Sequence, residues 1–279
     1  MPFFKTQIAA TLLKCFLLCF SISYFLACNN VDKKEIASTQ QSQEERKVAL
    51  RDAFKKYPDS TSLMLDLIGI YRDEGNYDTA MIITDREIKK DSLNAFLWNL
   101  KGTLYFENND TLNAIRSLHE AVAIYPDSDY LISLGMIYAE IRNANALIIA
   151  DELLKSDKGK LQKNALFIKG LYYNFKEEPV IAIPYFDKVL QLDFNYMYAY
   201  REKAIALYNL KKYKDAVEVL KRAVTLQNNF DEGYYWMGKS YEKMGMIEEA
   251  IQNYENALLY DKDYVEAREA LTQLKKKDH

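Results

Sequence analysis

The feature that most constrains this chain is an internal repeat of 34 residues. In the segment from Asp231 to Tyr264, apolar and small residues fall at fixed places, and stepping back by 34 residues meets the same residue types again. A repeat of this length predicts a helical or mixed unit stacked on copies of itself, because one unit cannot bury its apolar face alone. The repeat, rather than the total length, therefore determines how the chain is divided.

Small residues recur at two places in the repeat, with Ile68 of the first unit as the exception. Apolar residues between them have the three- and four-residue spacing of amphipathic helices, so each unit is predicted to form two helices of roughly 12 to 15 residues. Small side chains let two helix axes approach closely. The eighth position holds Ile68, Gly102, Gly135, Gly170, Ala204 and Gly238, and the twentieth, allowing one single-residue shift, holds Ala80, Ala114, Ala146, Ala182, Ala216 and Ala250.

A large aromatic residue recurs between these two positions. The eleventh position holds Tyr71, Tyr105, Tyr138, Tyr173, Leu207 and Tyr241. In this order the residues resemble the tetratricopeptide repeat pattern, W-x₂-L-G-x₂-Y followed by alanine and an aromatic residue. The resemblance implies an all-α fold, a right-handed superhelical solenoid of about six helix-turn-helix repeats with capping helices at both ends. The six repeats are expected at residues 61–94, 95–127, 128–162, 163–196, 197–230 and 231–264.

The sequence also predicts where the array of repeats ends and where individual helices end or bend. Residues 44–60 are expected to form an N-terminal capping half-repeat, and residues 265–279 a C-terminal capping helix and tail, because terminal repeats lack a neighbour.

Pro184 lies inside a predicted second helix and predicts a kink there. The irregular stretch 155–160 just before it is where we expect the superhelix to bend. The ends of second helices are predicted at Tyr57, Asp91, Tyr125, Asp193 and Asp261.

Residues 1–27 have the features of an export signal. The segment carries Lys5 and Lys14, no acidic residue, and an apolar run of thirteen residues that begins at Cys15. A membrane-spanning helix needs about 20 residues. A basic start, a short apolar stretch and a small residue at its end predict a secretory signal peptide. The alternative is an N-terminal membrane anchor that is never cleaved.

The end of this segment, Phe25-Leu26-Ala27-Cys28, resembles the bacterial lipobox, with Phe25 where leucine is usual. The resemblance implies that Cys28 is acylated, becomes the mature N-terminus and anchors the protein to a bacterial membrane. Asn29 rather than aspartate follows, which favours the outer membrane, in a periplasmic or surface-facing position. Residues 28–43 are polar without apolar periodicity, and we expect a flexible tether.

Composition excludes several classes of function. The net charge of −3 argues against nucleic-acid binding, which needs a basic face. Cys15 and Cys19 leave with the signal and Cys28 carries lipid, so no disulfide is expected. His119 and His279 have no partner at metal-ligand spacing, and no catalytic or phosphate-binding motif is present. We therefore expect no catalytic residue, no metal site and no cofactor, and a protein that is not an enzyme.

Binding has more support than catalysis. The resemblance places certain positions of each first helix along a concave groove, and aromatic residues and arginine there are typical of protein interfaces. The alternative for each side chain is packing against the next repeat. The expected partner is another protein or peptide. The candidate residues are Phe96, Asn99, Phe106, Phe167, Asn174, Phe175, Tyr198, Arg201, Tyr208, Tyr235, Trp236 and Lys239.

These observations together predict a lipid-anchored scaffold or adaptor of the bacterial cell envelope that binds a partner polypeptide in its groove. Two alternatives stay open at this point. One is a surface lipoprotein that binds a glycan or nutrient on its aromatic residues, and the other is an accessory subunit of an outer-membrane assembly or secretion complex. The pattern makes no prediction of the oligomeric state.

Overall fold

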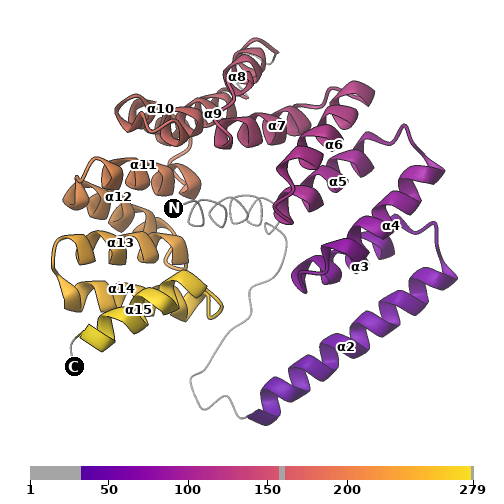
Figure 1. Ribbon diagram of the computed structural model, residues 1–279, viewed down its shortest axis with the longest axis horizontal. Helices are drawn as coiled ribbons and strands as arrows, with labels where there is room; N and C mark the ends of the chain where they lie inside the picture. The colour runs from indigo at the N-terminus through magenta and orange to yellow at the C-terminus, as the bar shows by residue number, and fades with distance from the viewer. Residues whose placement is uncertain (1–32, 157–160, 278–279) are drawn as a thin grey trace. The chain divides into compact units, whose positions relative to one another are not determined.

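The computed structural model describes residues 33–156 and 161–277, which form α-helices joined by turns, without any strand (Figure 1). The predicted all-α fold of consecutive helix pairs is confirmed. The helices are α2 (Lys33–Lys56), α3 (Thr61–Asp73), α4 (Tyr77–Lys90), α5 (Ala95–Glu107), α6 (Thr111–Ile124), α7 (Ser128–Glu140), α8 (Asn145–Ser156), α9 (Gln162–Phe175), α10 (Pro179–Leu192), α11 (Met197–Asn209), α12 (Tyr213–Leu226), α13 (Asp231–Lys243), α14 (Ile247–Tyr260) and α15 (Val265–Lys277).

The chain divides into two compact units between Tyr130 and Leu131, a boundary that lies within α7. In the first unit, each helix from α2 to α6 packs on the next one along the chain. In the second unit, the same holds from α8 to α15, and α11 also contacts α9 and α13. The first helices of successive repeats therefore lie next to one another in the second unit.

The close approach of the two helices in each pair depends on the predicted small residues. A Cβ atom added to Gly170 would lie 2.6 Å from Cε1 of Phe186, and one added to Gly238 would lie 2.8 Å from Cδ1 of Tyr254. Both distances are shorter than van der Waals contact, so only glycine fits. The alanines at the twentieth position of the repeats are completely buried: Ala80, Ala114, Ala146, Ala182, Ala216 and Ala250.

The turn between the two helices of a pair has the same backbone conformation in all six repeats. At Lys211, φ is 60°, and the N–H groups of Lys211 and Lys212 donate to the carbonyls of Tyr208 and Leu207, both at 2.9 Å. This is the Schellman arrangement that ends a helix, and it needs a residue in the left-handed region. Positive φ recurs at the equivalent residues, which are Gly75, Asn109, Arg142, Glu177 and Gly245.

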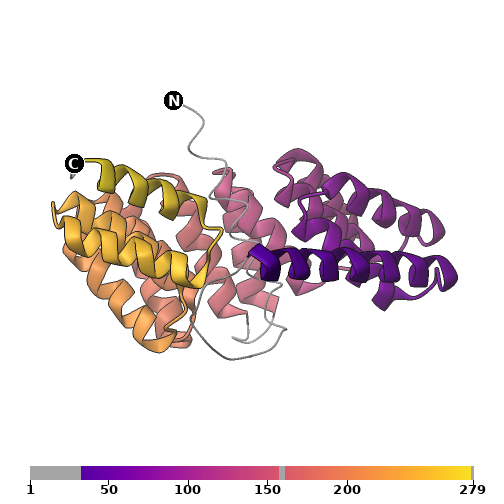
Figure 2. The same ribbon diagram turned by 90° about the horizontal axis from the view of Figure 1, so that it is seen from below.

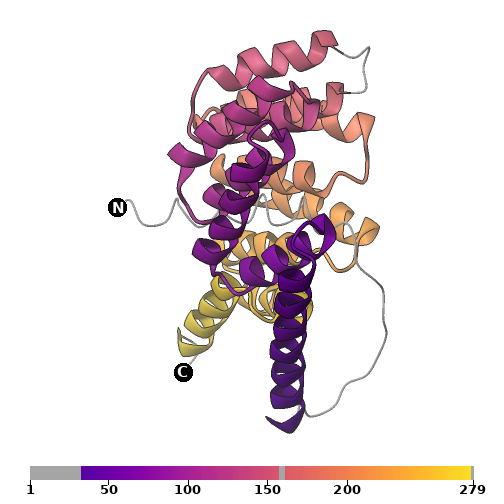
Figure 3. The same cartoon turned by 90° about the vertical axis from the view of Figure 1, so that its right-hand side faces the viewer.

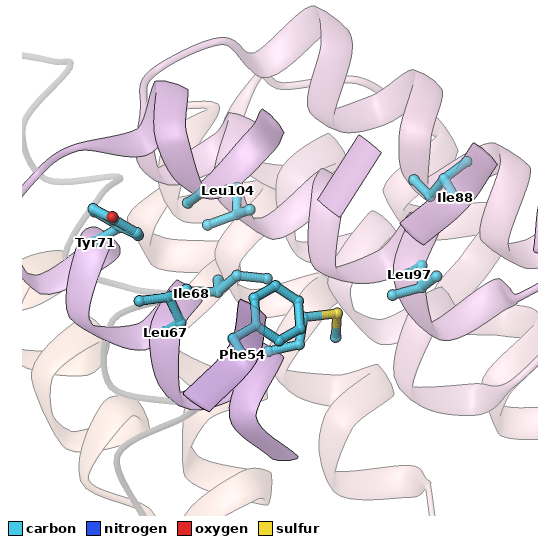
Figure 4. Packing of buried hydrophobic residues seen from close by; sticks show 9 residues of the cluster. Phe54, Leu67, Ile68, Tyr71, Ile88, Leu97 and Leu104 are labelled. Carbon is cyan, nitrogen blue, oxygen red and sulfur yellow. The ribbon is translucent and has the colours of Figure 1, made fainter. Parts of the chain in front are cut away.

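One end of each unit is covered by a single helix. In the first unit, Phe54 of α2 is buried against Leu67 and Ile68 of α3 (Figure 4), and the Arg86 guanidinium lies 4.6 Å from the centre of the Phe54 ring. In the second unit, Leu274 of α15 is buried with residues of α14, and Figure 2 shows α15 lying along that helix. The sequence expectation of a helix at each end agrees with this packing.

Helix α2 is longer than the sequence pattern predicts. It begins at Lys33, so residues 33–43, which we expected in a flexible tether, are helical, and Figure 3 shows α2 extending beyond the helix that follows it. The physical reason is that this stretch is rich in lysine, glutamate, alanine and glutamine and lacks glycine and proline. A helix already nucleated by the packing of Phe54 therefore propagates through it. Residues 1–32, with the signal and Cys28, lie outside the described residues.

The predicted helix ends are confirmed, since Tyr125, Asp91, Asp193 and Asp261 are C-caps and α2 ends one residue before Tyr57. Helix α10 starts at Pro179, where proline suits the first turn, and continues through Pro184 to Leu192. A kink at Pro184 stays a prediction. Most of the stretch where we expected a bend, residues 157–160, lies outside the described residues.

Replacing Lys211 with glycine should stabilise the protein, because glycine enters the left-handed region without the steric cost of a Cβ atom. We expect the free energy of unfolding to rise by about 1 kcal/mol in urea titrations followed by circular dichroism. The matched variant Asn109→Gly should gain less, since asparagine tolerates positive φ better than lysine. A loss of stability in Lys211→Gly would contradict this reading of the turn.

Replacing Gly170 with alanine should destabilise the protein by about 1 to 3 kcal/mol, because the new methyl group overlaps the Phe186 ring. Gly69→Ala is the control, since nothing lies within 4 Å of the Cβ position at that helical glycine. There alanine should stabilise by up to about 1 kcal/mol through its better helix propensity. Changes of the same sign in both variants, measured by urea titration, would rule out the close approach at Gly170.

Candidate binding face

The predicted binding residues divide into accessible and buried ones. Phe96 of α5 is 41% exposed, and Asn99, Phe175, Tyr198, Tyr208, Tyr235 and Lys239 are partly exposed. Five others pack inside the stack of helices, so their side chains offer little surface to a partner. These five are Phe106, Phe167, Asn174, Arg201 and Trp236. A role in partner binding stays a prediction for all twelve.

Two of the buried aromatic residues show why the repeat pattern alone does not predict which side chains are exposed. Phe167 points into the fourth repeat, where its ring lies 5.1 Å from that of Tyr196 and 5.9 Å from that of Phe186. Phe106 is 4% exposed within the first unit. The position within the repeat fixes which side of a helix a residue lies on, while the size of its neighbours determines whether it reaches the surface.

Three predicted aromatic residues from two neighbouring first helices come together around a fourth predicted residue, Lys239. The Lys239 ammonium lies 4.6 Å from the ring centre of Trp236, 5.5 Å from that of Tyr235 and 5.7 Å from that of Tyr208. We call Tyr208, Tyr235, Trp236 and Lys239 the Lys239 cluster. Burial lowers the pKa of the Lys239 ammonium, and attraction to three ring faces offsets part of that loss of hydration.

The rings of the Lys239 cluster also support one another. Trp236 meets Tyr208 edge-on at 5.5 Å and Tyr235 edge-on at 5.7 Å between ring centres, and Tyr235 lies 4.9 Å from Tyr264. Burial raises the pKa of Tyr208 to about 12 and raises that of Tyr235 further, so both hydroxyls keep their protons at physiological pH. The cluster is thus a rigid aromatic surface with hydroxyl groups and one cation.

A second cluster joins three neighbouring first helices through buried charges. Arg201 of α11 donates from Nη1 to both carboxylate oxygens of Glu232 on α13 at 2.5 Å, and from Nε to Oε1 of Glu202 at 3.1 Å. Asn174 of α9 donates from Nδ2 to Oε2 of Glu202 at 3.1 Å. All four side chains are buried, and pairing of this kind is what makes buried charge tolerable.

One more carboxyl group belongs to this second cluster. Burial raises the pKa of Glu140, at the end of α7, to about 8, and the negative charge of Glu202 adds to the rise. Burial also raises the pKa of Glu202, against the lowering effect of Arg201. We call Glu140, Asn174, Arg201, Glu202 and Glu232 the Arg201 cluster. The candidate residues predicted from the sequence include Asn174 and Arg201 but not the three glutamates, whose only signal is charge on successive first helices.

Other classes of site are not evident in residues 33–156 and 161–277. Within this part of the chain, no three histidine, cysteine, aspartate or glutamate side chains gather as a metal site would require. Of the helices described, none is both long enough and apolar enough to span a membrane. The proposed lipidation residue Cys28 lies outside the described residues.

The Arg201 cluster should make stability depend on pH. The pKa of Glu140 is about 8 in the folded protein against 4.5 ordinarily, so between these values the folded state binds more protons than the unfolded one. The free energy of unfolding should therefore fall as the pH rises from 4.5 through about 8, and level off at higher pH. Glu140→Gln should abolish this fall and exceed the parent in stability by on the order of 2 kcal/mol at about pH 9.

The control for this prediction is Glu152→Gln, which changes an exposed glutamate of α8 and should leave the pH profile of the parent unchanged. Urea titrations at a series of pH values provide the measurement. A Glu140→Gln protein with the same pH profile as the parent would show that Glu140 titrates normally.

Comparison with known proteins supports the assignment of the repeat. Residues 205–245 match the family described as TPR repeat, and residues 231–264 match the family described as tetratricopeptide repeat. A curated relative, the DnaJ homolog subfamily C member 7 homolog of Schizosaccharomyces pombe, is 22% identical over 221 residues. That match takes in 75% of this chain and 42% of the relative, so the chain spans less than half of the relative's length.

Solved structures share the fold at low sequence identity. A tetratricopeptide repeat protein from Parabacteroides merdae is 16% identical, with a TM-score of 0.69 over 87% of this chain and 96% of that chain. The type IV pilus biogenesis factor PilW is 18% identical, with a TM-score of 0.59 over 76% of this chain and 97% of that chain. The chain therefore contains tetratricopeptide repeats, matched at residues 205–264, and has the fold of tetratricopeptide repeat proteins.

Proposed function

We propose that this protein is a lipid-anchored scaffold or adaptor of the bacterial cell envelope that binds a partner polypeptide on the first helices of its repeats. The observation that carries the proposal is the Lys239 cluster. It places two partly exposed tyrosines and a partly exposed lysine, from two adjacent helices, on one surface around a nearly buried tryptophan.

The chemistry of this surface suits a polypeptide partner. Tyrosine and tryptophan supply large contact areas with few rotatable bonds, and they carry much of the binding energy in protein interfaces. Their rings already contact one another, so little side-chain entropy is lost when a partner binds. Tetratricopeptide folds generally serve in protein–protein interaction rather than catalysis, which favours a scaffold.

The envelope location rests on the N-terminal sequence. The segment Phe25-Leu26-Ala27-Cys28 after a short apolar run supports export and acylation at Cys28. Each buried CH₂ group of an acyl chain contributes about 0.8 kcal/mol, and stable attachment takes more than one chain. An accessory role in an outer-membrane assembly or secretion complex remains the second candidate, supported by likeness of fold to a pilus biogenesis factor.

A photo-crosslinking amino acid at Tyr198 should capture the partner polypeptide in intact cells, because this partly exposed side chain lies on α11 beside the Arg201 guanidinium. The matched control places the same amino acid at Leu259 of α14, which is 66% exposed on a second helix. Products are compared after denaturing purification and mass spectrometry. Identical products at both positions, or products only at Leu259, would argue against binding on the first helices.

Replacing Cys28 with serine should release the protein from the membrane fraction, because serine cannot carry the thioether lipid that the lipobox directs. Cell fractionation and metabolic labelling with a fatty acid provide the measurement. Retained acyl labelling in Cys28→Ser would refute the proposed anchor, and the helical circular dichroism of the variant serves as the control for folding.

A further inference from the structure

We propose that the Lys239 cluster is a subsite for the carboxylate of an aspartate or glutamate side chain of the bound polypeptide. This inference rests on the proposed function, since it specifies the chemistry of the partner that the first helices would bind. The cluster lies on α11 and α13, both within the second unit, and three of its four side chains are partly exposed.

The first argument is that the Lys239 ammonium has no acidic partner of its own. Lysines on three other first helices each pair with an aspartate on the second helix of the preceding repeat, at 2.5 to 2.6 Å: Lys101 with Asp85, Lys169 with Asp151 and Lys203 with Asp187. Lys239 forms no ion pair or hydrogen bond within residues 33–156 and 161–277. The three N–H donors of its ammonium group are therefore available to a ligand.

The carboxylates closest to this lysine do not take up its ammonium. Glu242 and Glu266 act on Lys239 only through longer-range attraction, which the charge of Lys243 opposes. The Tyr254 hydroxyl donates a hydrogen bond to Oε2 of Glu242 at 3.0 Å, so that carboxylate already has a partner. A partly desolvated ammonium gains most from a carboxylate at hydrogen-bond distance, and a ligand can supply one.

The second argument is that the hydroxyl groups of the cluster are also unused. Tyr208 and Tyr235 keep their protons at physiological pH, and neither hydroxyl makes a hydrogen bond in the described part of the chain. Together with Lys239 they offer donors from two helices on one surface. A carboxylate has two oxygens with about four lone-pair sites, so it can accept from several of these donors at once.

The third argument is that the rings hold the cation in place without satisfying its N–H groups. Trp236, Tyr235 and Tyr208 surround the ammonium, with ring centres at 4.6, 5.5 and 5.7 Å. A ring face attracts the positive charge but offers no lone pair to an N–H group. Because these contacts restrict the lysine side chain before binding, a carboxylate that pairs with it costs little additional side-chain entropy.

The same rings add a requirement on the residues beside the carboxylate. Tyr208 and Tyr235 are partly exposed, so an apolar side chain of the ligand can pack on them while the carboxylate pairs with Lys239. Each residue of an extended peptide covers about 3.4 Å. The distances from the ammonium to these rings therefore place the apolar side chain within about three residues of the acidic one.

The first test selects ligands from a random peptide library displayed on phage. The peptides are fused through their C-termini, so side chains supply their only carboxylates. Selection on the immobilised chain should enrich aspartate or glutamate within about three residues of an aromatic or large apolar residue. Lys239→Met keeps an apolar side chain of similar length and should lose the acidic enrichment. Lys188→Met, which changes an exposed lysine of α10, should retain it.

The second test measures the carboxylate directly on one selected peptide. The peptide is synthesised with capped ends in two forms, with glutamate or with glutamine at the acidic position. By isothermal titration calorimetry at low salt, we expect the glutamate form to bind the parent chain about tenfold more tightly. Lys239→Met should bind both forms equally, and Tyr235→Phe, which keeps the ring but lacks the hydroxyl, should reduce the difference to about threefold.

Circular dichroism confirms that each variant is folded, and the comparison of the two peptide forms on the parent chain needs no variant. No enriched peptide, enrichment without acidic residues, or equal binding of the two forms to the parent would overturn the carboxylate subsite. The same holds if Lys239→Met keeps the preference for glutamate. The crosslinking experiment at Tyr198 reads the proposed function separately, so a partner captured there would leave the binding function standing and remove only the subsite.

Discussion

Everything else in this structure depends on the close approach of two helices within each repeat. Gly170 against Phe186 and Gly238 against Tyr254 bring the helices together at points where even a methyl group would overlap an aromatic ring. The completely buried alanines of the second helices complete the contact. Because the helices approach there, the large residues on either side pack into neighbouring pairs, and the short helices of each unit bury apolar clusters between them.

The connection between the paired helices sets a second constraint. The same left-handed turn follows every first helix, although glycine occupies it only in the first and last repeats. The other four repeats place asparagine, arginine, glutamate or lysine there and accept a backbone strain of about 1 kcal/mol each. The hydrogen bonds of the turn and the packing around it repay that cost, so the turn is determined by the surrounding repeat more than by its own residue.

Much of the fold could be predicted from the sequence, because a period of 34 residues and small residues at fixed places follow directly from how helix pairs pack. The candidate site was less predictable. Whether Phe167 is buried and Tyr198 partly exposed depends on the neighbouring side chains, which a repeat position does not describe. The grouping of Glu140 with Glu202 joins residues more than sixty positions apart, and the helicity of residues 33–43 depends on propagation from a packed segment.

Helix α2 makes the link between the proposed lipid anchor and the repeats stiffer than the expected flexible tether would be. A coil of the same length would let the repeats collapse towards the lipid and sample every orientation. A helix of 24 residues instead acts as a stiff rod roughly 36 Å long, with Phe54 near one end fixed in the first repeat. If Cys28 is acylated as proposed, only a few residues before the other end, the rod would work as a stand-off that keeps the first unit at a set height above the bilayer.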